Sequence, residues 1–334
     1  MSSFRTVLPI APSPWKISYP AQFFLIGSCF TESIGDRLRQ EKFSVTSNPF
    51  GVVFNPISLA QQIEQFLEKE TFTQQDLQCY QEYWISPLHH SSFSSLHATE
   101  SLDLLNKALL AGKQALQQAQ YIVITWGTAR IYTLKETGSI VGNCHKVPAR
   151  YFERSMLQVE TIVSAYSQLI KKLKTLNASL KLIFTISPIR HSHDGFVENQ
   201  LSKSSLFVAL HELKTQHLEI SYFPSYEIIM DDLRDYRFYE ADMIHPNNQA
   251  IEYIWEHFRE TYFSASAIQL MQQIKSIQKA SQHQVFHPKS LAHQKFIATQ
   301  LSKIDHLISR YPFLDLSWER QHFLNELSSS SDRH

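Results

Sequence analysis

The amino-acid sequence predicts a three-layer α/β/α sandwich with a mostly parallel sheet, followed by a C-terminal helical extension. Short apolar runs alternate with amphipathic helical patterns over most of the 334 residues, which is typical of crossover units around a parallel sheet. From about residue 265 onward only helical patterning remains. Hydrophobic residues make up 43% of the chain, which is enough for a sizeable core. We therefore predict an α/β domain over residues 1–264 and a helical extension over residues 265–334.

Five apolar runs, each bounded by polar or turn residues, predict the strands of the sheet. Four of them form its body and one is an edge or second strand. The body strands are Phe23–Ile26, Tyr121–Thr125, Leu180–Ile186 and Leu218–Phe223, and the edge strand is Phe43–Thr46.

Apolar residues at helical spacing predict helices over residues 102–116, 159–173 and 251–262, each with one face on the sheet. Residues 67–99 break the alternation because they are polar and aromatic, and we expect an insertion over the sheet's edge. The helical patterns of residues 265–334 predict hairpins that pack on the main domain or form a homo-oligomer contact.

Composition limits the class of partner and the compartment. Lysine plus arginine equals aspartate plus glutamate, 31 against 31, so no overall field attracts nucleic acid or an anionic membrane. The three cysteines lack paired spacing, which predicts free thiols in a reducing compartment. The N-terminus lacks the apolar core of a signal peptide, and no run approaches the ~18 apolar residues of a membrane span. We expect a cytoplasmic protein.

Two distant segments suggest nucleophilic catalysis. Ser28 follows the first predicted strand in a small-residue turn, at the edge where open α/β sheets place ligands. Asp242 and His245 are three residues apart, so the carboxylate can orient the imidazole that would activate a hydroxyl. The hypothesis is a Ser28–His245–Asp242 hydrolase site. The alternative is a serine that only caps a helix, with a surface histidine and a solvated aspartate.

Six short motifs follow one another along the chain. They are Gly27-Ser28-Cys29-Phe30, Asn48-Pro49-Phe50-Gly51 with Asn55-Pro56, Trp126-Gly127-Thr128-Ala129, Asn143-Cys144-His145-Lys146, Ser187-Pro188-Ile189-Arg190-His191 and Asp242-x-x-His245-Pro246. Together and in this order they resemble the GSCFA family, which is similar to the SGNH (GDSL-like) esterases and acyl hydrolases. The resemblance covers roughly residues 20 to 260 and implies a flavodoxin-like fold of the SGNH-hydrolase type and ester chemistry.

The resemblance also implies an oxyanion hole. Esterases of the SGNH type use a glycine N–H after the second strand and an asparagine after the third. Gly51 fits the first position, but the third strand is followed by Gly127-Thr128-Ala129, so Thr128 or Asn143 would have to supply the third donor. Gly51 can equally be a plain turn glycine.

Three basic residues of the motifs could contact substrate. Arg190 could hold a carboxylate or phosphate, or could only tie the acidic residues of its own loop, and His145 and Lys146 could also contact the substrate. Lys203 is expected to be structural rather than to contact substrate.

The predicted function is a serine esterase or O-acyltransferase acting on an O-acyl ester of a carbohydrate or small molecule. One alternative makes Cys29 the nucleophile with His145 or His245, because a thiolate is intrinsically more nucleophilic. Another is a non-catalytic binding or scaffold protein. The sixteen histidines show no zinc-site spacing and the sequence has no glycine-rich nucleotide loop, so no metal or cofactor is predicted.

Overall fold

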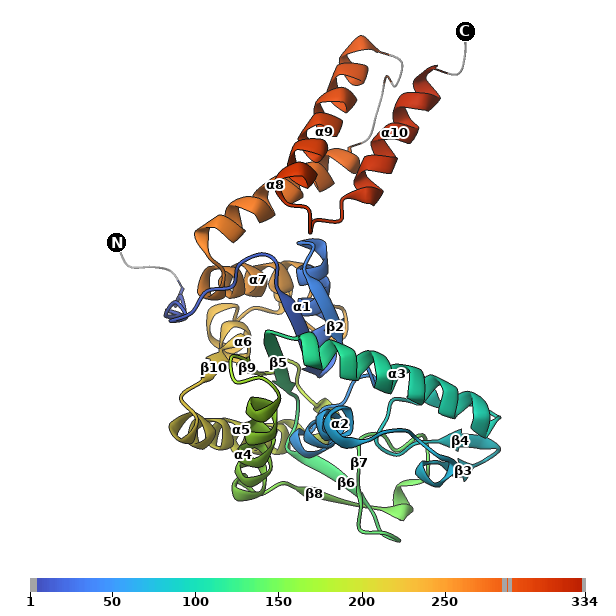
Figure 1. Cartoon of the computed structure of the whole chain (residues 1–334). Coiled ribbons are helices and arrows are strands. Elements are labelled where there is room, and N and C mark those ends of the chain that lie inside the picture. Colours follow the sequence, from blue (N-terminus) through green and yellow to red (C-terminus); the bar gives the residue numbers. More distant parts are fainter. Residues whose placement is uncertain (1–4, 284–286, 288–289, 332–334) are drawn as a thin grey trace.

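A five-stranded parallel sheet forms the centre of the molecule in the computed structural model, which describes residues 5–283, 287 and 290–331 (Figure 1). The strand order is β2-β1-β5-β9-β10, and every neighbouring pair is parallel. This is the flavodoxin-like order. The parallel α/β sheet and its five strands were predicted, and both predictions are confirmed. The strands are β1 (Gln22–Gly27), β2 (Ser44–Ser47), β5 (Tyr121–Trp126), β9 (Lys181–Ile186) and β10 (Ile220–Phe223).

Helices cover both faces of this sheet. The helices of the α/β body are α1 (Cys29–Gln40), α2 (Pro56–Glu68), α3 (Ala98–Gln118), α4 (Val159–Leu176), α5 (Phe196–Gln216), α6 (Ser225–Glu227) and α7 (Asn248–Tyr262). Phe24 and Ile26 of β1 pack in one core cluster with α2, α3, α4 and α5. Phe23 and Leu25 point to the other face, into a cluster with α1 and α7. Because the strand is buried on both faces, it reads as a continuous apolar run rather than an alternating one.

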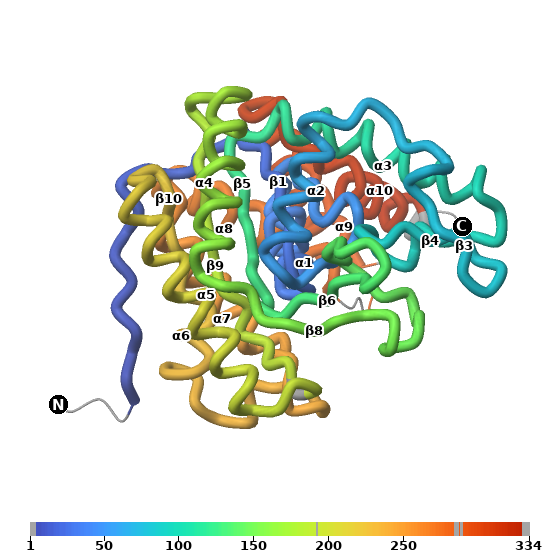
Figure 2. Tube along the Cα trace, turned by 90° about the horizontal axis from the view of Figure 1, so that it is seen from below, coloured from blue at the N-terminus to red at the C-terminus, as the bar shows by residue number. Residues whose placement is uncertain are grey.

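The N-terminal segment crosses the outside of the body before it enters β1 (Figure 2). Ile17 forms an isolated parallel bridge with Phe263, and the Trp15 ring lies 5.3 Å from that of Tyr262. The segment therefore packs against the end of the sheet beside α7.

Two small antiparallel sheets lie outside the central sheet. One is the pair β3 (Gln78–Tyr80) and β4 (Tyr83–Ile85), within the predicted insertion. The other has the order β7-β6-β8, from β6 (Arg130–Leu134), β7 (Ile140–Val141) and β8 (Phe152–Met156). The second was not predicted, because its strands are short and carry several exposed polar residues.

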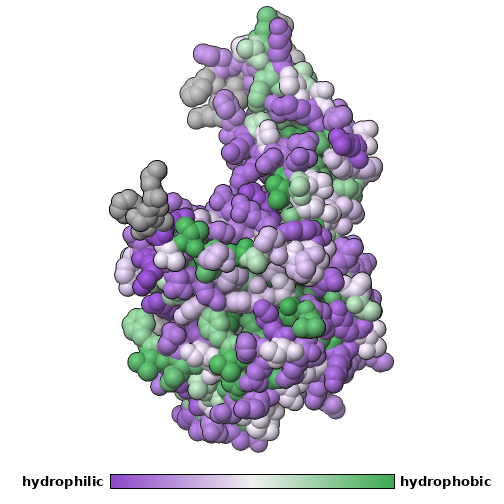
Figure 3. Space-filling model, turned by 90° about the vertical axis from the view of Figure 1, so that its left-hand side faces the viewer, coloured by the Kyte–Doolittle hydropathy of each residue, from purple (hydrophilic) through white to green (hydrophobic). Residues whose placement is uncertain are grey.

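Three helices form a C-terminal lobe that projects from the body (Figures 1 and 3). They are α8 (Ala265–Ser281), α9 (Leu291–Arg310) and α10 (Ser317–Ser331), and they share a core that includes Ile274, Ile304 and Phe323. Lys42 pairs with Glu319 at 2.8 Å where the lobe meets the body. The predicted helical extension is confirmed. Among the described helices, none offers an apolar stretch sufficient to cross a bilayer.

Candidate active site

The turn between β1 and α1 lies at the carboxyl edge of the sheet, where the strand order reverses between β2 and β5 on either side of β1. Ligands of open α/β sheets bind at such a switch point. Gly27 has a φ of +148°, and an added Cβ would overlap the backbone of Thr125 on β5. The Gly27 N–H donates to Asn48 Oδ1 at 2.8 Å. This turn fixes where α1 begins.

Ser28 is the N-cap of α1, but its hydroxyl does not cap the helix. The residue is only 1% exposed, and in the described part of the chain its Oγ has no hydrogen-bond partner. Its N–H donates to Thr125 O at 3.3 Å. The structure therefore does not bring the Ser28 hydroxyl into a hydrogen bond with His245, and the serine nucleophile stays a prediction.

Asp242 and His245 form the pair that their spacing predicts. Asp242 Oδ1 accepts from the backbone N–H groups of Ile244 and His245, both at 2.9 Å, and Oδ2 lies 2.6 Å from His245 Nδ1. Met243, between them, has a φ of +60°, which tightens the turn. These bonds lower the pKa of Asp242 to about 2, with the backbone N–H of His245 as the largest cause. A carboxylate on Nδ1 leaves Nε2 as the basic nitrogen.

Cys29, the first residue of α1, faces this basic nitrogen. Its Sγ lies 3.8 Å from His245 Nε2, within hydrogen-bond distance for sulfur. Burial raises the pKa of the Cys29 thiol, while the N–H groups of Cys29 and Phe30 and the charge of Lys203 act in the opposite direction. The contacts therefore run from Cys29 through His245 to Asp242.

Lys203 on α5 brings a buried charge to this edge. It is 0% exposed, and its Nζ donates to Gly127 O and Ser187 O, both at 2.6 Å. These carbonyls directly follow β5 and β9. Desolvation lowers the pKa of Lys203 to about 7, and interaction with Cys29 opposes the shift. The sequence signal was a lysine on the face of α5 that also carries Leu206 and Leu210.

Gly51 and Thr128, the first two expected oxyanion donors, are engaged elsewhere. The Gly51 N–H donates to Asn48 O at 2.7 Å, in a turn where φ is +83°. The backbone N–H of Thr128 donates to Phe54 O at 3.1 Å, and its Oγ1 lies 2.9 Å from Ser202 Oγ. Both residues keep a structural hydrogen bond that an oxyanion would have to replace.

Asn143 and His145 line a cavity that neither Cys29 nor His245 lines, together with Cys144 and Pro87. His145 Nε2 lies 2.7 Å from Ser86 O, and Asn143 Oδ1 accepts from the His145 N–H at 2.9 Å. The hydrogen bond that Cys29 makes is with His245 rather than with His145. The substrate roles of Asn143 and His145 stay predictions that these contacts do not support.

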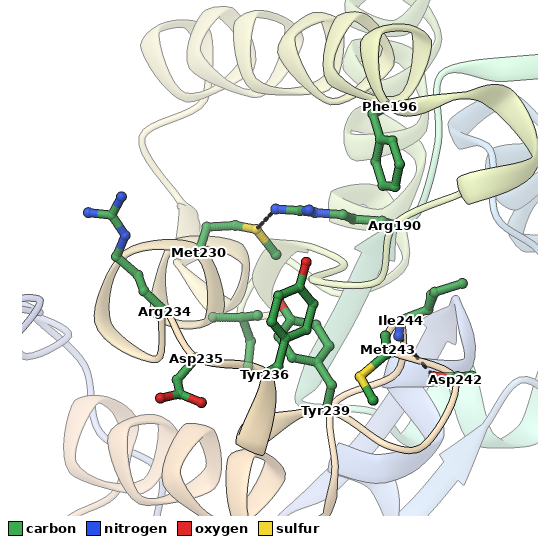
Figure 4. A pocket seen from close by; sticks show the side chains of 11 residues that line it. Arg190, Phe196, Met230, Arg234, Asp235, Tyr236, Tyr239, Asp242, Met243 and Ile244 are labelled. Carbon is green, nitrogen blue, oxygen red and sulfur yellow. Dashed lines mark hydrogen bonds between the residues drawn. The ribbon is translucent and has the colours of Figure 1, made fainter.

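Two neighbouring cavities open at the edge of the sheet. One, of about 370 Å³, is lined by Cys29, Ile189 and His245. The other, of about 450 Å³, is lined by Arg190 and Asp242 and is shown in Figure 4. Consecutive residues of the same two loops line the two cavities. The second cavity therefore lies next to Cys29 and His245.

Comparison with known proteins places these features in a family. The GSCFA family model matches residues 22–258, and the model of the C-terminal domain of GSCFA proteins matches residues 274–329. No curated protein matches the sequence.

Some solved structures resemble the chain weakly. A carbohydrate esterase family 3 enzyme from Talaromyces cellulolyticus has a TM-score of 0.36 at 9% identity, covering 77% of this chain and 99% of its own. A family 3 carbohydrate esterase from Clostridium thermocellum has a TM-score of 0.35 at 8% identity, covering 76% and 98%. An acetyl xylan esterase from the rumen bacterium Butyrivibrio proteoclasticus has a TM-score of 0.37 at 11% identity, covering 73% and 64%. Similarity this weak assigns no activity to the chain.

Proposed function

The chain belongs to the GSCFA family, and we propose that it is an acyl-transferring enzyme that cleaves an ester by nucleophilic catalysis at Cys29. The observation that carries this proposal is the pair of contacts at His245. Its Nε2 lies 3.8 Å from Cys29 Sγ, and its Nδ1 lies 2.6 Å from Asp242 Oδ2. A weak nucleophile is activated by an adjacent base that a carboxylate orients, and the contacts at His245 have this arrangement.

The reaction follows from these positions. His245 Nε2 takes the thiol proton, the Cys29 sulfur attacks the ester carbonyl carbon, and the carbonyl π electrons move to oxygen. The N–H groups of Cys29 and Phe30 at the start of α1 act to lower the pKa of the thiol, and we propose that they also donate to the developing oxyanion. When the carbonyl reforms, the carbon–oxygen ester bond breaks and protonated His245 gives its proton to the leaving alkoxide. A thioester on Cys29 remains.

The second half of the reaction releases the acyl group. His245 deprotonates water or a second alcohol, which attacks the thioester carbon, and the Cys29 thiolate leaves and regains its proton from His245. Throughout, Asp242 holds the imidazole with Nδ1 protonated and stabilises its cationic form. We propose an O-acyl ester, such as an acetyl ester, of a carbohydrate or small molecule as the substrate.

Substitutions at the two adjacent candidates test the nucleophile. Cys29→Ala should lower turnover of p-nitrophenyl acetate by at least ~10³-fold, as loss of a triad nucleophile does, whereas Ser28→Ala should retain most of it. Cys144→Ala is the matched control, because Cys144 is also a half-buried free thiol but lines a different cavity. Mass spectrometry of the protein quenched during turnover should find the acetyl group on Cys29.

The competing assignments predict different results. If Cys29→Ala is active and a folded Ser28→Ala protein is inactive, Ser28 is the nucleophile. Absence of turnover and of acyl-enzyme with p-nitrophenyl acetate, its butyryl and longer homologues and acetylated sugars would favour the non-catalytic binding protein.

A further inference from the structure

Two arginines, Arg190 and Arg234, line the cavity that adjoins Cys29 and His245. Arg190 donates from Nη2 to the sulfur of Met230 at 3.1 Å, and a thioether is a weak acceptor. Arg234, from the opposite wall, makes no ion pair with any residue that the structure describes. Among the described residues, the half-buried Arg190 guanidinium hydrogen-bonds to this sulfur, which leaves further N–H donors for an external acceptor.

The carboxylates in the same wall are already satisfied by other groups. Asp242 uses both oxygens for two backbone N–H groups and His245. Asp235 accepts from the Arg237 N–H at 2.9 Å and lies 3.9 Å from the Arg237 guanidinium. In the part of the chain that the structure describes, neither carboxylate therefore pairs with Arg190, although both bring negative charge to the wall.

Exposed aromatic side chains flank Arg190. Phe196 is 70% exposed and Tyr236 is 71% exposed, and the ring of Tyr236 lies 5.9 Å from that of Tyr239. Figure 4 shows Arg190 reaching across the cavity, with Phe196 on one side and the tyrosines on the other. Aromatic rings gathered around a few polar groups in a concave site are typical of small-molecule recognition.

We propose that this cavity binds the part of the substrate that does not react, and that Arg190 recognises a carboxylate or phosphate on it while the aromatic side chains contact its ring. The proposal deepens the proposed function, on which it rests, by naming the substrate as an ester of an anionic, ring-containing molecule such as a uronic acid or a sugar phosphate. Because Asp242 lies in the wall of this cavity, the part of the substrate bound there would lie near the ester that reacts.

A binding experiment without chemistry separates this proposal from the catalytic one. Glucuronate, glucose 6-phosphate and glucose are titrated into the full-length protein by calorimetry, since none of them is an ester. We expect glucuronate or glucose 6-phosphate to bind at least ~10-fold more tightly than glucose, as a charge-assisted hydrogen bond allows. Which of the two binds more tightly distinguishes carboxylate from phosphate.

Variants then locate the anion. Arg190→Gln should remove the preference for the charged sugar, whereas Arg150→Gln, at an exposed arginine over Tyr151, should not. Equal binding of charged and neutral sugars, a preference that survives Arg190→Gln, or no measurable binding of any of the three would overturn the proposal. Because binding is measured without turnover, an inactive protein that still prefers the charged sugar would refute only the catalytic assignment.

Discussion

Gly27→Ala should be among the most damaging single-methyl changes in the chain, because Gly27 lies where β1 meets β5 and where α1 is set. The added Cβ would overlap the Thr125 carbonyl oxygen and lie only 2.8 Å from Thr125 Cβ and 2.9 Å from Thr125 N. These are backbone-bound atoms of the neighbouring strand, paired in register with Gly27. They cannot move without shifting β5.

Two costs add at this position. Forcing a methyl group into a packed interior costs about 1–3 kcal/mol, and more where backbone must move. The φ of +148° adds a strain of about 1–3 kcal/mol for alanine. The free energy of unfolding should therefore fall by about 2–6 kcal/mol, a large share of the 5–15 kcal/mol that is typical of folded proteins.

Gly138→Ala is the matched control. Gly138 also has a positive φ, +70°, but an added Cβ would meet nothing within 4 Å. It should lose only about 1–2 kcal/mol, the cost of the left-handed conformation. The measurement is urea unfolding of both variants beside the parent, read as the shift of the midpoint at constant slope. Equal losses in the two variants would refute the argument from the Thr125 contact.

Two further predictions concern Lys203 and Asp242. Lys203→Met should lower the free energy of unfolding by roughly 1–3 kcal/mol for each carbonyl oxygen left without its donor, because the Lys203 Nζ donates to Gly127 O and Ser187 O at 2.6 Å; Lys214→Met, on the same helix, is the control, and equal urea midpoints of the two variants would contradict this role. Asp242→Asn should lower ester turnover by more than ~10²-fold, because it alters the imidazole tautomer. Asp305→Asn, at an ion pair with Arg320 in the C-terminal lobe, is the control and should not lower it. Equal rates in the two variants would show that Asp242 does not orient the base.

Much of the sheet could be predicted from the sequence, because strands buried on both faces carry unbroken apolar runs. The Phe23–Ile26 run lies within β1 and the Leu180–Ile186 run overlaps β9 almost completely. The small sheet of β6, β7 and β8 could not be predicted in the same way. Its strands are paired mainly by backbone hydrogen bonds to each other, and their side chains lack a consistent apolar face.

The candidate site, too, could be predicted from the sequence only where its contacts are local. Asp242 and His245 could be paired from the sequence, since their contact is local to one turn. The sequence favoured Ser28 over Cys29, whereas the structure brings the Cys29 sulfur to His245. Neighbouring residues at a helix start point in directions about 100° apart, so the sequence alone does not show which of them faces the imidazole. Which of them faces His245 depends on where the turn at Gly27 starts α1. The approach of Lys203 to this edge depends on the packing of α5 and is equally non-local.

The helix α8 belongs to two cores at once. Ala267 and Met271 are part of the core cluster of α1 and α7, whereas Leu270 and Ile274 are part of the core of the C-terminal lobe. A chain ended at residue 264, where the helical pattern suggests a boundary, would leave two positions of the body's core unfilled and expose the apolar surface around them. Because one rigid helix carries both sets of contacts, we expect body and lobe to unfold as a single cooperative unit.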